Sequence, residues 1–518
     1  MGSWSLRRVG ESVRTALVRP KGRVVLSRLR ATPRWFSPAR RRRFRAALAV
    51  MVTAALSAAC SSNGGPTPPT GPPVGGQTDA EFLQDVQSRT FDFFWETTNA
   101  ANGLVPDRWP TPSFSSVAAV GFGLTAYLVG VERGWTTRTQ ARDRVLSTLR
   151  FFWNAPHNDQ PTQVTGYRGF YYHFLDMQTG HRFQQVELST IDTGLLLMGV
   201  LAAQEYFDES DPAEAEIRAL ADSIYFRVDW EWASVRPPAI SMGWHPETGF
   251  IAHDYDGYNE AMFLYVLALG SPTHPLPEEA WTEFTSTYRW GEFYGQPHVN
   301  FGPLFGHQYS HVWIDFRGIQ DAYMRGRGID YFENSRRATL AQRAYAVHNP
   351  NGWEGYGATL WGLTASDGPG DFRATIGGRE REFHGYWARG AAAGELRDDG
   401  TIAPTAVGGS VPFAPEITIP ALRAMRDGTA GNLYSRYGFK DAFNLTLDVP
   451  GLAQVGTTVP GVGWFDVDYL GIDQGPILLM IENHRTGFVW SLMRENDHIV
   501  RGLCRAGFTG GWLAGRCA

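Results

Sequence analysis

The chain has 518 residues, of which 43% are hydrophobic and 19% are charged, and its formal net charge is −5. Residues 1–45 hold 14 of the 47 basic residues and one of the 52 acidic residues, which leaves a net charge of about −18 on the remainder. A surface this acidic argues against nucleic acids and anionic membranes as partners. Lys440 is the only lysine after residue 45, which excludes a P-loop, and excludes Schiff-base chemistry unless Lys440 performs it.

Residues 1–60 are typical of an export leader. A basic stretch is followed by the 14 uncharged, mostly apolar residues 46–59 and then by Cys60. This order indicates a secretory signal, because 14 residues are too few for a membrane span of about 20. The sequence Leu-Ser-Ala-Ala-Cys at 56–60 resembles a bacterial lipobox, so we expect lipidation at Cys60 and anchoring to the bacterial envelope, facing the periplasm or the surface. An ordinary signal peptide is the alternative.

Residues 61–77 are rich in proline, glycine and serine. Such a segment cannot build a core and is predicted to be a tether. Residues 78–518 contain few breaks of this kind, so we expect one large domain, in a monomer that meets the membrane only through the lipid anchor.

Helical periodicity dominates from residue 79 onward. Amphipathic stretches are predicted to be helices at 79–97, 137–153, 212–228 and 278–290, and nearly all-apolar stretches at 117–133, 189–207 and 258–269. A helix that is apolar on every face must be buried on all sides. The alternation predicts an all-α fold, an (α/α)6 toroid with inner and outer helices.

Two segments interrupt the helical pattern. Residues 169–183 and 241–251 have the spacing of β-hairpins around a Thr-Gly turn. We expect them to be short β-hairpin insertions in the loops of one face of the toroid.

Carboxylates beside aromatic rings are the candidate functional residues of this chain. Rings that stack on sugar faces and carboxylates that bind hydroxyls are typical of a carbohydrate cleft. Cleavage of a glycosidic bond needs little more than one carboxylic acid and one carboxylate. The candidates are Glu187, Asp192, Asp254, Asp256, Tyr258, Glu260, Trp353, Glu354, Trp361 and Glu416.

These candidates also have structural interpretations. Ser189-x-x-Asp192 before an apolar run fits a capping box, so Asp192 serves capping, function or both. Glu260 precedes an apolar helix without such a motif, which favours function. Glu187 is expected to support the site, and Glu354 and Glu416 fit either interpretation. The remaining aromatic and imidazole side chains, including His173, His253 and His307, are interpreted as structural.

Neither a metal nor a cofactor is predicted. The run 466–473 has aspartates at spacings similar to a calcium loop, but Leu470 occupies a ligand position and no glutamate closes the loop. In an exported protein, Cys504 and Cys517 are predicted to form a disulfide, with free thiols as the alternative.

Three motifs carry a resemblance to a known family. Glu-Leu-Ser-Thr-Ile-Asp-Thr at 187–193, Trp-Gly-Leu-Thr-Ala-Ser-Asp-Gly-Pro at 361–369 and the run from Asp473 to Trp490 resemble the bacterial glucoamylase-like family, which is related to the endo-β-1,2-glucanases of glycoside hydrolase family 144. The resemblance covers roughly residues 79–500. It implies an (α/α)6 barrel, inverting hydrolysis of a β-glucan, and catalytically important acids at Asp192 and Glu260.

Physical arguments suggest a role for each of these two acids. The first turn of a helix favours the charged form of Asp192, which suits a base or a residue that orders water. Glu260, in an aromatic setting with Asp254 and Asp256 nearby, is expected to have a raised pKa and to donate a proton. The expected function is hydrolysis of a β-linked glucan, most plausibly β-1,2-glucan. The alternatives are a non-catalytic glycan-binding lipoprotein and a relative that transfers sugars or cleaves another linkage.

Overall fold

The computed structural model describes residues 76–517, so the predicted leader, Cys60 and most of the predicted tether lie outside the described residues. None of the helices within this range combines the length and the apolar character that a membrane-spanning helix needs.

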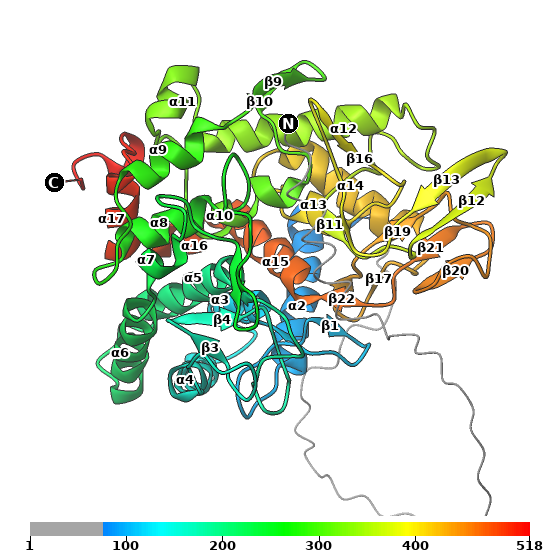
Figure 1. Ribbon diagram of the computed structural model, residues 1–518. Helices are drawn as coiled ribbons and strands as arrows, with labels where there is room; N and C mark the ends of the chain where they lie inside the picture. Colours follow the sequence, from blue (N-terminus) through cyan, green and yellow to red (C-terminus); the bar gives the residue numbers. More distant parts are fainter. Residues whose placement is uncertain (1–75, 518) are drawn as a thin grey trace, which may run out of the picture. The chain divides into compact units, whose positions relative to one another are not determined.

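Helices provide most of the regular structure (Figure 1). The α-helices are α2 (Asp79–Thr97), α3 (Val117–Glu132), α4 (Arg138–Asn154), α5 (Thr190–Tyr206), α6 (Pro212–Phe226), α7 (Trp230–Ala233), α8 (Met262–Gly270), α9 (Glu279–Ser286), α10 (Tyr309–Trp313), α11 (Ala322–Arg327), α12 (Tyr331–His348), α13 (Pro404–Gly408), α14 (Pro415–Gly428), α15 (Gly471–Arg485), α16 (Phe488–Met493) and α17 (Asp497–Arg505). Two 3-10 helices, η1 (Leu304–His307) and η2 (Gly511–Leu513), complete the set.

The strands are short and pair in small antiparallel sheets, the largest having the order β3-β4-β6-β7-β8. They are β1 (Arg108–Trp109), β2 (Ser115–Ser116), β3 (Gly166–Tyr167), β4 (Phe170–Tyr172), β5 (Phe174–Leu175), β6 (Leu188–Ser189), β7 (Gly243–His245), β8 (Gly249–Phe250), β9 (Trp290–Phe293), β10 (Gln296–Val299), β11 (Ala365–Ser366), β12 (Phe372–Ile376), β13 (Arg379–Phe383), β14 (Trp387–Ala388), β15 (Gly390–Ala392), β16 (Glu395–Arg397), β17 (Tyr434–Ser435), β18 (Gly438–Phe439), β19 (Phe443–Asn444), β20 (Thr457–Val459), β21 (Gly463–Phe465) and β22 (Tyr469–Leu470).

All seven predicted helices are present, five of them within two residues of the predicted bounds. Helix α8 begins later than predicted because Asn259 accepts a hydrogen bond from the amide of Ala261 at 2.8 Å and holds the preceding residues in a turn. Helix α9 ends at Ser286. The residues predicted to form its last turn, 287–290, instead lead into strand β9, which begins at Trp290.

The two predicted hairpins differ in outcome. Strands β7 and β8 form the hairpin expected within 241–251. Within 169–183 the expected hairpin is present only in part, because β4 lies between β3 and β6, and β5 also pairs with β2. The Thr-Gly turn there closes only a single bridge between Leu175 and Arg182.

The all-apolar helices form an inner layer. Helix α3 packs against α5 and α15, α5 packs against α8, and α10 packs against α8 and α15. Helix α13 packs against α15, and Gln308, just before α10, donates a hydrogen bond to the carbonyl of Ala406 in α13 at 2.8 Å. Amphipathic helices cover this layer: α2 lies on α15, α4 pairs with α6, and α17 lies on α8. Figure 1 shows α15 beside α2 and α3, although α15 is near the end of the described chain and the other two helices are near its start.

The C-terminal segment is fastened covalently. A disulfide joins Cys504, near the end of α17, to Cys517. The pairing expected from the sequence is therefore present in the structure.

Two glycines allow α3 and α5 to approach closely. A Cβ atom on Gly199 would lie 2.1 Å from the carbonyl oxygen of Gly121, and a Cβ atom on Gly121 would lie 2.1 Å from the carbonyl oxygen of Leu195. Both obstacles are backbone atoms, which cannot rotate away as side chains can. The spacing of the inner helices therefore depends on the absence of side chains at these positions.

We expect the substitution Gly199→Ala to lower the free energy of unfolding by about 3 kcal/mol, since overpacking of a dense core forces backbone shifts. Urea denaturation measures the change. The matched control is Gly326→Ala in α11, where a Cβ atom has nothing within 4 Å, and which should be neutral or stabilising by up to about 1 kcal/mol. Equal effects at both positions would contradict the packing argument.

Candidate active site

Strand pairing brings the first group of acids together. Strand β4 pairs with β6 so that Tyr172 lies opposite Leu188, and the next amide, that of His173, donates to the carbonyl of Glu187 at 3.0 Å. Strand β6 leads directly into α5, whose first turn contains Asp192. His173, Glu187 and Asp192 thus meet at the start of a buried inner helix.

His173 faces a carboxylate with each ring nitrogen. Its Nδ1 lies 2.8 Å from Oε1 of Glu187, and its Nε2 lies 3.6 Å from Oδ2 of Asp192. The hydroxyl of Ser189 donates to the same Asp192 oxygen at 2.5 Å and accepts a hydrogen bond from the amide of Asp192 at 3.2 Å. Ser189 is therefore the helix cap, and the carboxylate of Asp192 binds the capping hydroxyl and faces the imidazole.

Opposing effects determine the protonation of this group. Burial lowers the pKa of His173, but the charges of Asp192 and Glu187 more than offset it and raise that pKa to about 9. Burial likewise opposes ionisation of Glu187, yet His173 lowers the pKa of Glu187 to about 2. Burial raises the pKa of Asp192, which is only 3% exposed, against the opposing effects of His173 and Ser189. The expectation that the helix start alone would favour ionised Asp192 misjudged this balance, because burial is the largest effect.

Glu260 is the second member of the expected catalytic pair. It lies in the turn before α8, half-buried, and its backbone carbonyl accepts a hydrogen bond from the hydroxyl of Ser310 at 2.8 Å. Burial, together with the charge of Asp192, raises the pKa of Glu260 to about 7. The pKa is raised as expected, but the neighbouring charge comes from Asp192 and not from Asp254 or Asp256.

A second group of acids lies beside the first. One carboxylate oxygen from each of Asp367, Asp441 and Asp466 lies within 4.8 Å of the other two. All three side chains are buried, and Arg108 binds Asp367 at 2.6 Å. Burial and mutual repulsion hold the pKa values of Asp441 and Asp466 well above the ordinary aspartate range.

The spacing of this second group is compatible with a divalent cation coordinated by oxygen, and these residues are the ones that would hold it. Without a bound cation, the raised pKa values of Asp441 and Asp466 favour protonated carboxyl groups.

The hydroxyl of Tyr309 is affected by charges from both groups of acids. The pKa of Tyr309 is raised by burial and then by the charges of Asp473, Glu260 and Asp441. Burial also raises the pKa of Asp473, to about 7. Tyr309 lies within electrostatic range of Glu260 and Asp441, and Asp107 lies within range of His173 and Asp367, so the two groups of acids lie near each other.

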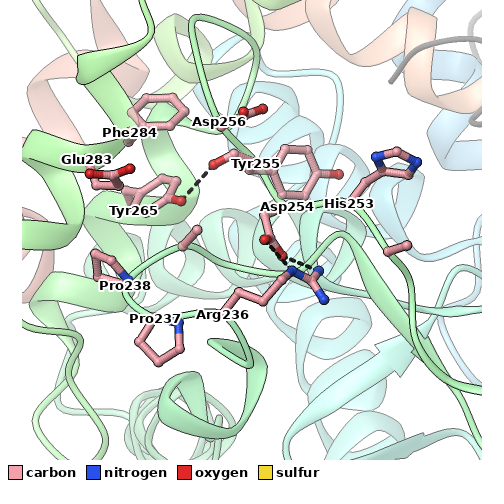
Figure 2. Close-up of a pocket in the computed structure, with 12 residues that line it drawn as sticks. Arg236, Pro237, Pro238, His253, Asp254, Tyr255, Asp256, Tyr265, Glu283 and Phe284 are labelled. Atoms are coloured by element: carbon pink, nitrogen blue, oxygen red, sulfur yellow. Dashed lines mark hydrogen bonds and ion pairs between the residues drawn. The ribbon is translucent and has the colours of Figure 1, made fainter. Parts of the chain in front are cut away.

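Asp254 and Asp256 line a different space. Both residues line a cavity of about 380 Å³. Figure 2 shows Arg236 directed at Asp254 beside this cavity, and the two side chains form an ion pair at 2.5 Å. The hydroxyl of Tyr265 donates to the carbonyl of Tyr255 at 2.7 Å beside this cavity. Tyr255 also lines this cavity, and the charges of Glu260 and Asp192 raise the pKa of its buried hydroxyl further, so the cavity lies near these acids. Tyr258 is buried elsewhere, with its ring 4.8 Å from that of His307.

Four further candidates are not in the acidic site. Trp361 is fully buried in a hydrophobic core, and Trp353 is buried with the Arg381 guanidinium 4.0 Å from its ring centre. Neither can present a free face to a sugar, so the prediction of sugar platforms is wrong. Glu354 is exposed, and Glu416 binds Arg336 at 2.7 Å in the first turn of α14.

Several residues of the site were missed or misread from the sequence. His173 was interpreted as structural, and Asp367 and Asp441 were not singled out. A role for His173 could have been predicted from strand pairing. His173 follows the aromatic strand β4, and β4 pairs with β6 directly before α5. Asp466 begins the run 466–473 and Asp367 lies in the motif 361–369, but no local signal shows that they meet Asp441, because the three come from separate loops.

Comparisons with known proteins agree with this architecture. A family model with the description "Putative glucoamylase" matches residues 252–497. A crystal structure of a "putative glucoamylase" from Bacteroides uniformis is 33% identical, with a TM-score of 0.72 over 85% of this chain and 99% of that one. An endo-β-1,2-glucanase from Chitinophaga pinensis, solved with sophorotriose and glucose, is 27% identical, with a TM-score of 0.71 over 85% of this chain and 100% of that one.

A curated relative points to the same group of enzymes. The exo β-1,2-glucooligosaccharide sophorohydrolase (non-reducing end) of Parabacteroides distasonis is 29% identical over 460 residues. The match covers 82% of this chain but 58% of the relative, so the chain spans little more than half the length of that protein.

The raised pKa of Glu260 predicts a pH-dependent change in stability. The unfolded carboxyl ionises near pH 4.5 and the folded one near pH 7. Between these values the folded state keeps a proton that the unfolded chain releases, so the stability contribution of this group falls as the pH rises. The neutral variant Glu260→Gln should therefore gain on the order of 3 kcal/mol relative to wild type at pH 8, and nothing at pH 4.

Urea unfolding of both proteins at the two pH values measures this difference. Glu279→Gln, at an exposed position in the first turn of α9, is the control and should show no such dependence. A stability difference that is the same at pH 4 and pH 8 would contradict the assignment of a raised pKa to Glu260.

Proposed function

We propose that this chain, which belongs to the bacterial glucoamylase-like family, is a glycoside hydrolase that cleaves β-1,2-linked glucans by inversion. The observation that carries the proposal is the pairing of Glu260, whose pKa is raised to about 7, with a nearby buried carboxyl, Asp192, that faces a cationic imidazole. One carboxyl able to hold a proton and one carboxylate are what glycosidic hydrolysis requires.

The proposed reaction is a single displacement. Glu260 donates its proton to the glycosidic oxygen as the bond from that oxygen to the anomeric carbon breaks. A water molecule attacks the anomeric carbon from the opposite face and gives its proton to Asp192. Asp441, in the second acid group, is the less suitable base, because its raised pKa favours the protonated form, which cannot accept a proton from water.

The similarity to enzymes that act on β-1,2-glucan supports the choice of linkage. Two similar proteins carry that linkage in their descriptions, and the match to the Chitinophaga pinensis enzyme covers its full chain. The acidic surface favours a neutral glucan over an anionic polysaccharide.

We also propose a toroidal arrangement of the helices and a location at the bacterial envelope. The inner contacts of α3, α5, α8, α10, α13 and α15 support a ring of six helices, with the amphipathic helices outside it, as in an (α/α)6 toroid. We place the protein, as a monomer, at the bacterial envelope, exported and lipidated at Cys60, on the sequence of residues 1–60.

Digestion of β-1,2-, β-1,3-, β-1,4- and α-glucans, followed by proton NMR of the first product, tests the activity. We expect cleavage of β-1,2-glucan with an α-anomeric product, since inversion of a β-linkage gives the α-anomer. Binding of the glucan without products would support the non-catalytic alternative. Products from another linkage would correct the substrate, and a β-anomeric first product would exclude inversion.

The variant Glu260→Gln should lower kcat by about 10²- to 10⁴-fold on β-1,2-glucan, because general acid catalysis contributes that much. Asp192→Asn and Asp441→Asn, compared at the same pH, identify the base, and we expect the larger loss for Asp192→Asn. Glu279→Gln is again the matched control and should keep wild-type kcat. Near-full activity of Glu260→Gln would contradict its role as proton donor.

A further inference from the structure

Both ring nitrogens of His173 face the oxygen of an acidic side chain. A neutral imidazole has one N–H donor and one bare nitrogen, whereas the imidazolium has two donors. Nδ1 and Nε2 of His173 each face a carboxylate, at 2.8 Å from Glu187 and at 3.6 Å from Asp192. A bare nitrogen facing an ionised acid would place two lone pairs against each other, so two ionised carboxylates favour the imidazolium, which carries a proton on each nitrogen.

The ring is held in place from several sides. It stacks on Phe174 with ring centres 3.9 Å apart. The backbone of His173 donates to the carbonyl of Glu187 at 3.0 Å and accepts from the amide of Val117, at the start of α3, at 3.2 Å. These backbone bonds fix the position of the main chain of His173, while stacking on Phe174 and the contact with Glu187 hold the ring itself.

We propose that His173 is a positioning residue of the reaction described above, a cationic clamp that Glu187 holds by one nitrogen while the other nitrogen orients the carboxylate of Asp192. The proposal rests on the proposed function for its catalytic meaning, but its physical content concerns the resting protein. It gives Glu187 a defined role, that of fixing the ring.

The charged groups that face His173 come from three segments. Asp192 faces it from α5, Glu187 from the residue before β6, and Asp107 from the loop before β1. His245 in β7 lies behind Glu187 and, through its charge, lowers the pKa of that glutamate slightly further. Three acids surround one imidazole, so the balance favours the imidazolium.

The clamp has a consequence for Asp192. Burial alone would keep its carboxyl protonated, and a protonated carboxyl could not accept a proton from water. The imidazolium opposes this effect, so Asp192 can remain an anion inside the site. His173 itself cannot serve as the base, because both of its nitrogens already carry protons.

The first test observes the imidazole directly in the full-length protein. Nitrogen-15 NMR of histidine-labelled wild type should show a doubly protonated His173 at pH 7, with its titration midpoint near pH 9. In Asp192→Asn and in Glu187→Gln, which preserve side-chain shape, the midpoint should fall by about one to three pH units. The control within the same spectra is His157, whose pKa burial lowers to about 3, and whose signal should not change.

This measurement does not depend on the enzymatic activity, so a failure of the proposed function would leave its result intact. A wild-type midpoint near the ordinary value of about 6.5, or a midpoint that neither variant changes, would overturn the clamp.

The second test is kinetic and separates positioning from support of the fold. His173→Gln should lower kcat by about 100-fold, the scale of a small misplacement of a reacting group, with little change in KM. Its acidic limb in kcat/KM should move to higher pH, because loss of the cation raises the pKa of Asp192. Reduced activity with an unchanged pH profile would mean that His173 only supports the fold, and would overturn the proposal.

Discussion

The contact of His173 with two buried carboxylates is the interaction on which the acidic site depends. A carboxylate removed from water is unstable unless a cation or several donors accompany it. Here one imidazole, at 2.8 Å from Glu187 and 3.6 Å from Asp192, supplies the positive charge. Without it, Asp192 would bind a proton and lose its capacity to act as a base.

The inner helices explain why the acids lie at such depth. Helix α5 is buried along nearly its whole length, and its first turn carries Asp192. The glycines that let α3 approach α5 bring that helix close to its neighbours. The same burial that provides the core therefore raises the pKa of the acids, and the charge of Asp192 raises the pKa of Glu260 further, to about 7.

The helices could be predicted from the sequence, and much of the site could not. Apolar runs such as 189–207 admit one arrangement, a helix buried on every face, and the structure has it as α5. Trp353 lies in a glycine-rich segment and was a candidate for stacking on sugar, but Gly400 packs against its indole, since a Cβ atom there would lie 2.5 Å from the ring. Glycine-rich loops fold back on themselves, which composition alone does not reveal. The second acid group joins Asp367 to Asp441 and Asp466 across loops far apart in sequence, and no local pattern predicts such contacts.

The central claim, that Glu260 delivers the proton to a β-1,2-glucosidic oxygen, is tested most directly by a crystal structure of the Glu260→Gln variant with a β-1,2-glucooligosaccharide bound. The account predicts a glycosidic oxygen within hydrogen-bonding distance, about 3 Å, of the amide that replaces the carboxyl of Glu260, with Asp192 on the opposite side of the sugar ring. An oligosaccharide bound with no glycosidic oxygen near that amide, for example in the cavity beside Asp254 and Arg236 shown in Figure 2, would contradict it.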